Sequence, residues 1–145
     1  MRILGLDTGS KRIGVALSDE LLLTAQGAGT IERRGPEADL EAIKKIISEN
    51  GVAEVVVGLP LNMDGTHSAK TKETIAFAEK LAAAIPVPLK MQDERLTTVQ
   101  AERALLEADT SRSKRKGLRD MIAAQLILQA YLDGRKREGA DGRGK

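Results

Sequence analysis

The sequence has 145 residues, a length typical of one domain, and 41% of them are hydrophobic, which supports a folded core. It contains no cysteine and one histidine, His67, which excludes disulfides, thiolate nucleophiles, zinc–thiolate sites, iron–sulfur clusters and any site with two histidine ligands. The formal net charge is only +2, so the placement of charge is more informative than its sum, and two aromatic residues are too few for a platform that stacks single-stranded bases.

The first part of the chain predicts strands. Arg2 to Leu6 and Ile13 to Leu17 are apolar runs on either side of a turn at Gly9 and Ser10, which is typical of a hairpin. Residues 26–31 form a weaker third strand, because the run contains an Ala-Gly-Ala-Gly repeat.

Strands and helices then alternate. Gly35-Pro36 begins a helix that ends at Asn50-Gly51, and a β-branched strand follows from Glu54 to Gly58. The remaining predicted elements are a helix over 68–84 with Ile75, Ala78, Leu81, Ala82 and Ile85 inward, a strand over 87–92, a helix from Thr97, a basic linker, and a last helix over about 117–132. This order predicts an α/β fold in which a mixed sheet has helices on both faces.

Two further expectations concern the chain as a whole. We expect residues 1–134 to form a single domain and residues 135–145, which contain no apolar residue larger than Ala, to form a basic disordered tail. No segment is long and apolar enough to cross a membrane, and the N-terminus turns polar after six residues, unlike a signal peptide. We therefore expect a cytoplasmic protein without membrane contact.

Acidic residues follow the predicted strands. Asp7 ends the first strand, Asp93 and Glu94 end the last, and ligands of open α/β sheets bind at such carboxyl ends. Asp120 begins the final helix, above Ala123, Ala124 and Ile127 at helical spacing, so it is expected to face the sheet. Because side chains alternate along a strand, only one of Asp93 and Glu94 should face this site, and the sequence does not say which.

Three carboxylates without cysteine favour a hard cation with oxygen ligands, Mg²⁺ or Mn²⁺. Two such ions can clamp a phosphoryl transfer. Basic residues flank each proposed ligand, as binding of a nucleic-acid backbone requires. These residues are Lys11, Arg12, Arg95, Arg112, Lys114, Arg115, Lys116 and Arg119.

Four segments together resemble the YqgF/RuvX family of Holliday-junction-resolvase-like proteins. They are GLDTGSKRIGVALSD at 5–19, VVVGLPLNMDG at 55–65, DERLTTVQAE at 93–102 and DMIAAQLILQAYL at 120–132. The resemblance implies an RNase H-like fold of βββαβαβα order and metal-dependent cleavage of structured nucleic acid. It implies Asp7, Glu94 and Asp120 as catalytic metal ligands, with Asp93 the poorer match for the second position.

The resemblance also implies a substrate and a setting. Family members are linked to maturation of the 5′ end of pre-16S rRNA during ribosome biogenesis, and ribosomal assembly intermediates are the expected partners. They are also similar to resolvases that cut four-way DNA junctions, so a branched DNA substrate and either a monomer or a homodimer stay open. A non-catalytic RNA-binding assembly factor is a further alternative. The first hairpin is also similar to the phosphate loop of actin-like and sugar-kinase ATPases, but those enzymes close two such domains around ATP, and this chain is long enough for one.

Overall fold

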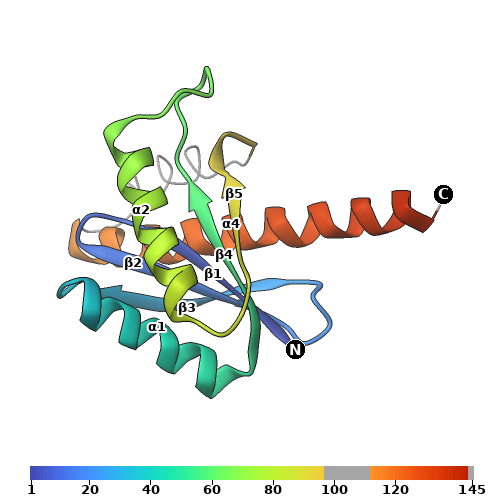
Figure 1. Ribbon diagram of the computed structural model, residues 1–145, viewed down its shortest axis with the longest axis horizontal. Coiled ribbons are helices and arrows are strands. Elements are labelled where there is room, and N and C mark those ends of the chain that lie inside the picture. Colours follow the sequence, from blue (N-terminus) through green and yellow to red (C-terminus); the bar gives the residue numbers. More distant parts are fainter. Residues whose placement is uncertain (97–111, 144–145) are drawn as a thin grey trace.

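The computed structural model describes residues 1–96 and 112–143, with side chains described for 1–95 and 117–136 (Figure 1). The elements in chain order are β1 (Arg2–Thr8), β2 (Arg12–Ser18), β3 (Ala25–Glu32), α1 (Pro36–Asn50), β4 (Val52–Leu59), α2 (Ala69–Ala84), β5 (Leu89–Asp93), the short 3₁₀ turn η1 (Glu94–Leu96) and α4 (Arg112–Arg143). The helix predicted from Thr97 lies outside the described residues. None of the helices in the described ranges is long and apolar enough to cross a membrane.

The five strands form one mixed sheet in the order β3-β2-β1-β4-β5. The first three are joined as antiparallel hairpins, whereas β4 pairs with β1 and β5 pairs with β4 in parallel. Parallel strands need a crossover connection, which α2 provides between β4 and β5. The carboxyl ends of β1, β4 and β5 therefore meet at one edge of the sheet.

Helices cover both faces of this sheet, so the predicted architecture is confirmed (Figure 1). On one face α1 and α2 pack on the strands through a core that includes Leu4, Leu6, Val57, Ile43 and Leu81. On the other face α4 packs through a second core that includes Ile3, Ala16, Val56, Ala124 and Leu128. Neighbouring residues of β1 and β4 alternate between the two cores, as expected of strands buried on both sides.

The helix ends follow local sequence signals. Pro36 stands in the first turn of α1, and Gly51, with φ of 59°, adopts the left-handed conformation that closes its C-terminus. Ser68 caps α2 and forms a capping box with Thr71. These signals explain why the predicted bounds of both helices agree closely with the structure.

The inward face of α2 differs from the prediction. Ala82 is exposed and Ile75 only partly covered, while Thr71 and Thr74 are buried beside Ala78 and Leu81. Both threonines find partners: Thr74 Oγ1 lies 3.2 Å from Thr8 Oγ1, and Thr71 Oγ1 donates to the carbonyl of Pro60. Polar side chains are tolerated in the interior when they are hydrogen-bonded, which hydrophobic spacing alone does not reveal.

Helix α4 is longer than predicted at both ends. The expected basic linker over 112–116 is its beginning, and the tail that we expected to be disordered is helical as far as Arg143. Beyond Gly134, Arg135 Nη1 donates to Glu54 Oε2 at 2.8 Å and ties the helix to the start of β4. Residues 134–143 include three arginines, Lys136, Glu138 and Ala140, which favour helix, together with three glycines, which do not.

Candidate active site

Asp7 is the last residue but one of β1 and faces the side of the sheet that α4 covers. It pairs with Gly14 of β2, and paired residues point to the same side of a sheet. A Cβ atom at Gly14 would overlap the carbonyl oxygen of Asp120 in α4. The Asp7 side chain and the helix backbone at Asp120 therefore lie on the same face and at the same level of the sheet.

Small residues let α4 approach this closely. A Cβ at Gly5 would lie 2.8 Å from Leu128 Cβ, and one at Gly27 would lie 2.7 Å from Met121 Cγ. The predicted stripe below Asp120 is buried, with Ala123 1%, Ala124 0% and Ile127 0% exposed. Glycines on the strands and alanines on the helix thus fix where Asp120 stands.

Asp7 and Asp120 line one cleft of about 380 Å³. Asp7 is 4% exposed, and Asp120 is partly covered. A buried carboxylate needs compensating charge or hydrogen bonds. Four basic residues line the same cleft: Lys11, Arg12, Lys70 and Arg119.

The two acids at the end of β5 point in different directions. Asp93 faces the side of α1 and α2, where it binds Arg95: Arg95 Nη2 lies 2.8 Å from Asp93 Oδ2, and the Arg95 amide donates to Asp93 Oδ1 at 2.9 Å. The hydrogen bonds from the Arg95 side chain lower the pKa of the Asp93 carboxyl, and the same contact raises the pKa of Arg95. Asp93 is thereby held by its neighbour.

Glu94 reaches the other face. Its Oε1 lies 2.9 Å from where a Cβ of Gly58 would stand. Gly58 follows Val57, the parallel partner of Leu6, so it lies beside Asp7 in the neighbouring strand. The structure therefore has Glu94, and not Asp93, on the face that carries Asp7 and Asp120.

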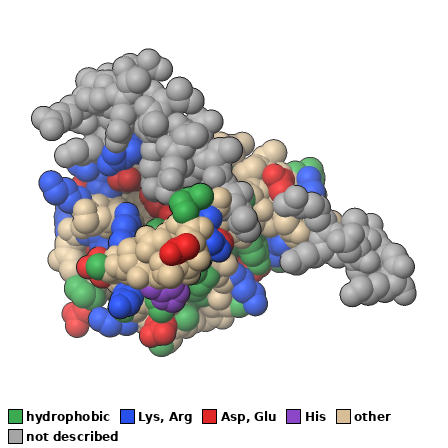
Figure 2. All heavy atoms as spheres, turned by 90° about the horizontal axis from the view of Figure 1, so that it is seen from above, with side chains coloured by type: hydrophobic (Ala, Val, Ile, Leu, Met, Phe, Trp, Pro, Cys, Tyr) green, Lys and Arg blue, Asp and Glu red, His purple; other side chains and the backbone are tan. Residues whose placement is uncertain are grey.

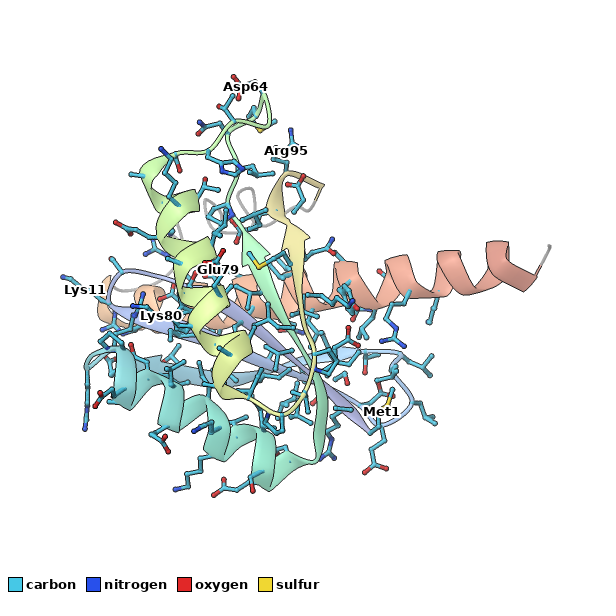
Figure 3. The ribbon with its side chains drawn as sticks, viewed as in Figure 1. Met1, Lys11, Asp64, Glu79, Lys80 and Arg95 are labelled. Atoms are coloured by element: carbon cyan, nitrogen blue, oxygen red, sulfur yellow. The ribbon has the colours of Figure 1, made fainter. Side chains whose placement is uncertain are left out.

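The proposed basic residues divide into three groups. Lys11, Arg12 and Arg119 line the cleft, and Arg12 also pairs with Glu32 at 2.8 Å. Arg95 is bound to Asp93 and donates to the Met63 carbonyl at 3.2 Å, so it braces the loop over 60–67 (Figure 3). The third group lies in the first turns of α4, where the structure describes the backbone but not the side chains. Its members are Arg112, Lys114, Arg115 and Lys116.

Lys70 was not identified from the sequence as a residue of this cleft. It stands in the first turn of α2, two residues after the Ser68 cap, and this turn meets the β1–β2 turn at the cleft. The alternation of strands and helices was predicted, and the crossover that α2 makes from β4 to β5 sets the helix N-terminus at the edge where the acids lie. The position of Lys70 in the first turn of this helix was the signal from which its place at the cleft could have been predicted. Figure 2, which looks onto the end of the molecule where β4 and β5 finish, shows Lys and Arg side chains beside carboxylates.

The donor set fits a hard cation, because it contains carboxylate oxygens and neither thiolates nor paired imidazoles. In the part of the chain that the structure describes, no three acidic or histidine side chains form a ready-made cage for a metal ion. Mg²⁺ is commonly bound by one or two carboxylates together with substrate phosphates, and such sites need no cage of protein ligands alone. Asp7 and Asp120 in one cleft meet this requirement.

The fold is that of RNase H-like resolvases. The Holliday-junction complex of T. thermophilus RuvC matches with a TM-score of 0.55 at 13% identity, covering 91% of this chain and 96% of that one. The fowlpox virus Holliday junction resolvase matches with a TM-score of 0.53 at 14% identity, covering 92% and 99%. At such identities the likeness shows the fold, and the predicted fold class is confirmed.

The chain belongs to the RuvX family, described as Holliday junction resolvase, whose model matches residues 1–134. A relative from Halothermothrix orenii, provisionally named pre-16S rRNA nuclease, is 53% identical over 133 residues, which are 92% of this chain and 95% of that protein. One from Moorella thermoacetica with the same provisional name is 54% identical over 133 residues, with the same two coverages. The predicted family is confirmed, and with it the predicted class of enzyme, a nuclease that hydrolyses phosphodiester bonds.

Proposed function

We propose that this protein is a divalent-metal-dependent endonuclease that cleaves structured nucleic acid, with the 5′-end processing of pre-16S rRNA as its reaction. The observation that carries the proposal is the cleft in which a nearly buried Asp7 meets Asp120 among four basic side chains. Acidic groups for a cation and basic groups for phosphates are both needed to cut a polyanion. The provisional name of the relatives supports the choice of RNA.

Asp7, Glu94 and Asp120 are the residues that would hold Mg²⁺ or Mn²⁺. When bound, a pair of such ions activates a water molecule as nucleophile and stabilises the leaving oxygen. Lys11, Arg12, Lys70 and Arg119 bind and orient the phosphates of the strand. The carboxylates act as ligands, so their ionised form is the active one.

A four-way DNA junction is the second candidate substrate, because the family model carries the description Holliday junction resolvase. A symmetric junction offers two equivalent cleavage positions, so this activity would require a dimer. The RNA substrate places no such demand on the oligomeric state. Ribosomal assembly intermediates are the partners that the RNA reaction implies, and the bacterial cytoplasm is its setting.

A cleavage assay with Mn²⁺ tests the proposal. A pre-16S rRNA fragment and a four-way DNA junction are incubated side by side with the wild-type protein, Asp7→Asn and the control variant Asp93→Asn. We expect cleavage of the RNA, loss of cleavage in Asp7→Asn and retention in Asp93→Asn. Cleavage of the junction alone would select the second candidate. Tight binding of RNA without cleavage would favour a non-catalytic assembly factor and refute the nuclease.

A further inference from the structure

A second cleft lies on the other side of the β1–β2 turn. It has a volume of about 490 Å³ and shares Gly9, Ser10 and Lys70 with the cleft of Asp7. The turn is therefore a narrow wall between two spaces, and Lys70 borders both. The rest of the second cleft is lined from β1, α2 and the segment after β3, with Arg33 and Phe77 on its wall.

Arg33 is held in a fixed position at this wall. Its Nε donates to Asp39 Oδ2 at 3.3 Å, and its Nη1 donates to the Gly9 carbonyl at 2.9 Å. The guanidinium carbon lies 5.3 Å from the centre of the Phe77 ring. Asp39 is 1% exposed, so the carboxylate that orients Arg33 is itself fixed in the interior.

This arrangement leaves one edge of the guanidinium for a ligand. The Arg33 side chain is 30% exposed, and its Nη2 donates no hydrogen bond within the described part of the chain. The lining residues of the cleft include Arg33, Lys70 and the carboxylate Glu73, while Asp39, which pairs with Arg33, lies behind the wall and is buried. A guanidinium oriented in advance loses little side-chain entropy when it binds an anion, and its planar fork matches a phosphate.

We propose that the second cleft is a phosphate subsite for the substrate strand. Arg33 receives a phosphodiester group that flanks the scissile one, and Lys70 binds the strand as it passes over the β1–β2 turn. The proposal rests on the proposed function, because the strand must occupy the cleft of Asp7. The Gly9 carbonyl joins Arg33 to the turn that follows Asp7, so occupancy of the subsite aligns the strand with the acids.

A scan with neutral phosphates tests the subsite. Substrates that carry a single methylphosphonate at successive positions are bound to Asp7→Asn protein, so that cleavage does not interfere. We expect one flanking position at which neutralisation weakens binding about tenfold, the size expected for one charge-assisted hydrogen bond. In Asp7→Asn/Arg33→Gln that position should lose its effect, whereas Asp7→Asn/Arg34→Gln, which alters an exposed neighbour, should keep it.

The outcomes separate the subsite from a structural role. If Arg33→Gln weakens binding equally for every modified substrate and leaves the sensitive position unchanged, Arg33 only supports the turn and the proposal is wrong. Should Arg33→Gln fail to fold, Lys70→Gln is compared with Lys72→Gln on the same helix, and equal profiles would overturn the proposal. The proposed function is judged separately, by whether Asp7→Asn still cleaves.

Discussion

The two faces of the sheet carry side chains of different size. Beneath α1 and α2 the strands present large aliphatic side chains, such as Leu4, Leu6 and Val57. Beneath α4 the strands have glycines at positions 5, 14, 27 and 58. The helix packs on this face with the small residues Ala123 and Ala124. Both faces bury apolar side chains, and the second also lets the backbone of α4 approach the strands closely.

Polar contacts add to the difference. Gln125 Nε2 donates to the Ala25 carbonyl at 3.1 Å, and Gln129 Oε1 accepts from the Ala25 amide at 2.9 Å, so α4 is tied to the edge strand β3. At the other end Tyr131 and Arg135 both bind Glu54. The comparison teaches that the α4 face combines an apolar core with strand glycines, and that these glycines bring Asp120 to the cleft of Asp7.

The largest effect is expected from the acids on the α4 face. Asp7→Asn, Glu94→Gln and Asp120→Asn should each lower the rate of cleavage about a thousandfold or more, about 4 kcal/mol of transition-state stabilisation. The free energy of unfolding should change by no more than about 1 kcal/mol, as measured by urea denaturation. Activity retained by any of these variants would remove that residue from the site.

Packing changes should separate the two faces. Ile43→Ala on the α1 side should lower the free energy of unfolding by about 2–5 kcal/mol and leave kcat of the folded protein unchanged. Gly14→Ala should cost about 1–3 kcal/mol and also reduce kcat, because its methyl group would push Asp120 away from the sheet. Gly117→Ala, where the added methyl group meets nothing within 4 Å, is the matched control. An unchanged kcat in Gly14→Ala would show that close packing does not set the site.

Charge at the start of α4 should affect binding without affecting the fold. Replacing Arg115 and Lys116 with Ala should weaken binding of every sequence and lower the salt slope by about 0.7–0.9 for each lost contact. Lys44 and Lys45, which lie on α1 away from the cleft, are the control pair. A slope that does not differ between the two double variants would exclude phosphate contacts by the α4 pair.

The smallest effect concerns the Tyr131 contact with Glu54. Burial, and next the hydrogen bond to Glu54, raise the pKa of Tyr131 to about 12. The unfolded chain releases this proton near pH 10, so the contribution to stability is complete below pH 10 and is lost as the pH rises toward 12. Thermal unfolding of Tyr131→Phe should depend less on pH in this window than that of the wild type. Identical profiles would show that the contact does not stabilise α4.

The sequence predicted the elements better than the contacts. Hydrophobic runs and helix caps were enough for the strands, for α1 and for α2, because these signals are local. The inward threonines of α2 were missed, since their burial depends on hydrogen-bond partners in β1 and in the loop after β4. The helical tail was missed because Arg135 is anchored by Glu54, 81 residues earlier in the chain.

The site was predicted in part for the same reason. Asp7 and Asp120 were placed by strand ends and helix spacing, and the structure has them in one cleft. The alternation of side chains along the strand could not decide whether Asp93 or Glu94 faces Asp7. In the structure Arg95 binds Asp93, and Gly58 leaves room for Glu94 on the face of Asp7. Lys70 and Arg33 reach the β1–β2 turn through tertiary contacts that periodicity does not contain.

Binding of Mn²⁺, followed by the loss of its free-ion EPR signal, tests the central claim most directly. The claim is that the acids of the α4 face hold the cation and that Asp93 does not. Titrations in the presence of substrate strand should give tight binding for the wild type and for Asp93→Asn, and clearly weaker binding for Asp7→Asn, Glu94→Gln and Asp120→Asn. Equal affinity in all five proteins, or a loss confined to Asp93→Asn, would contradict the account.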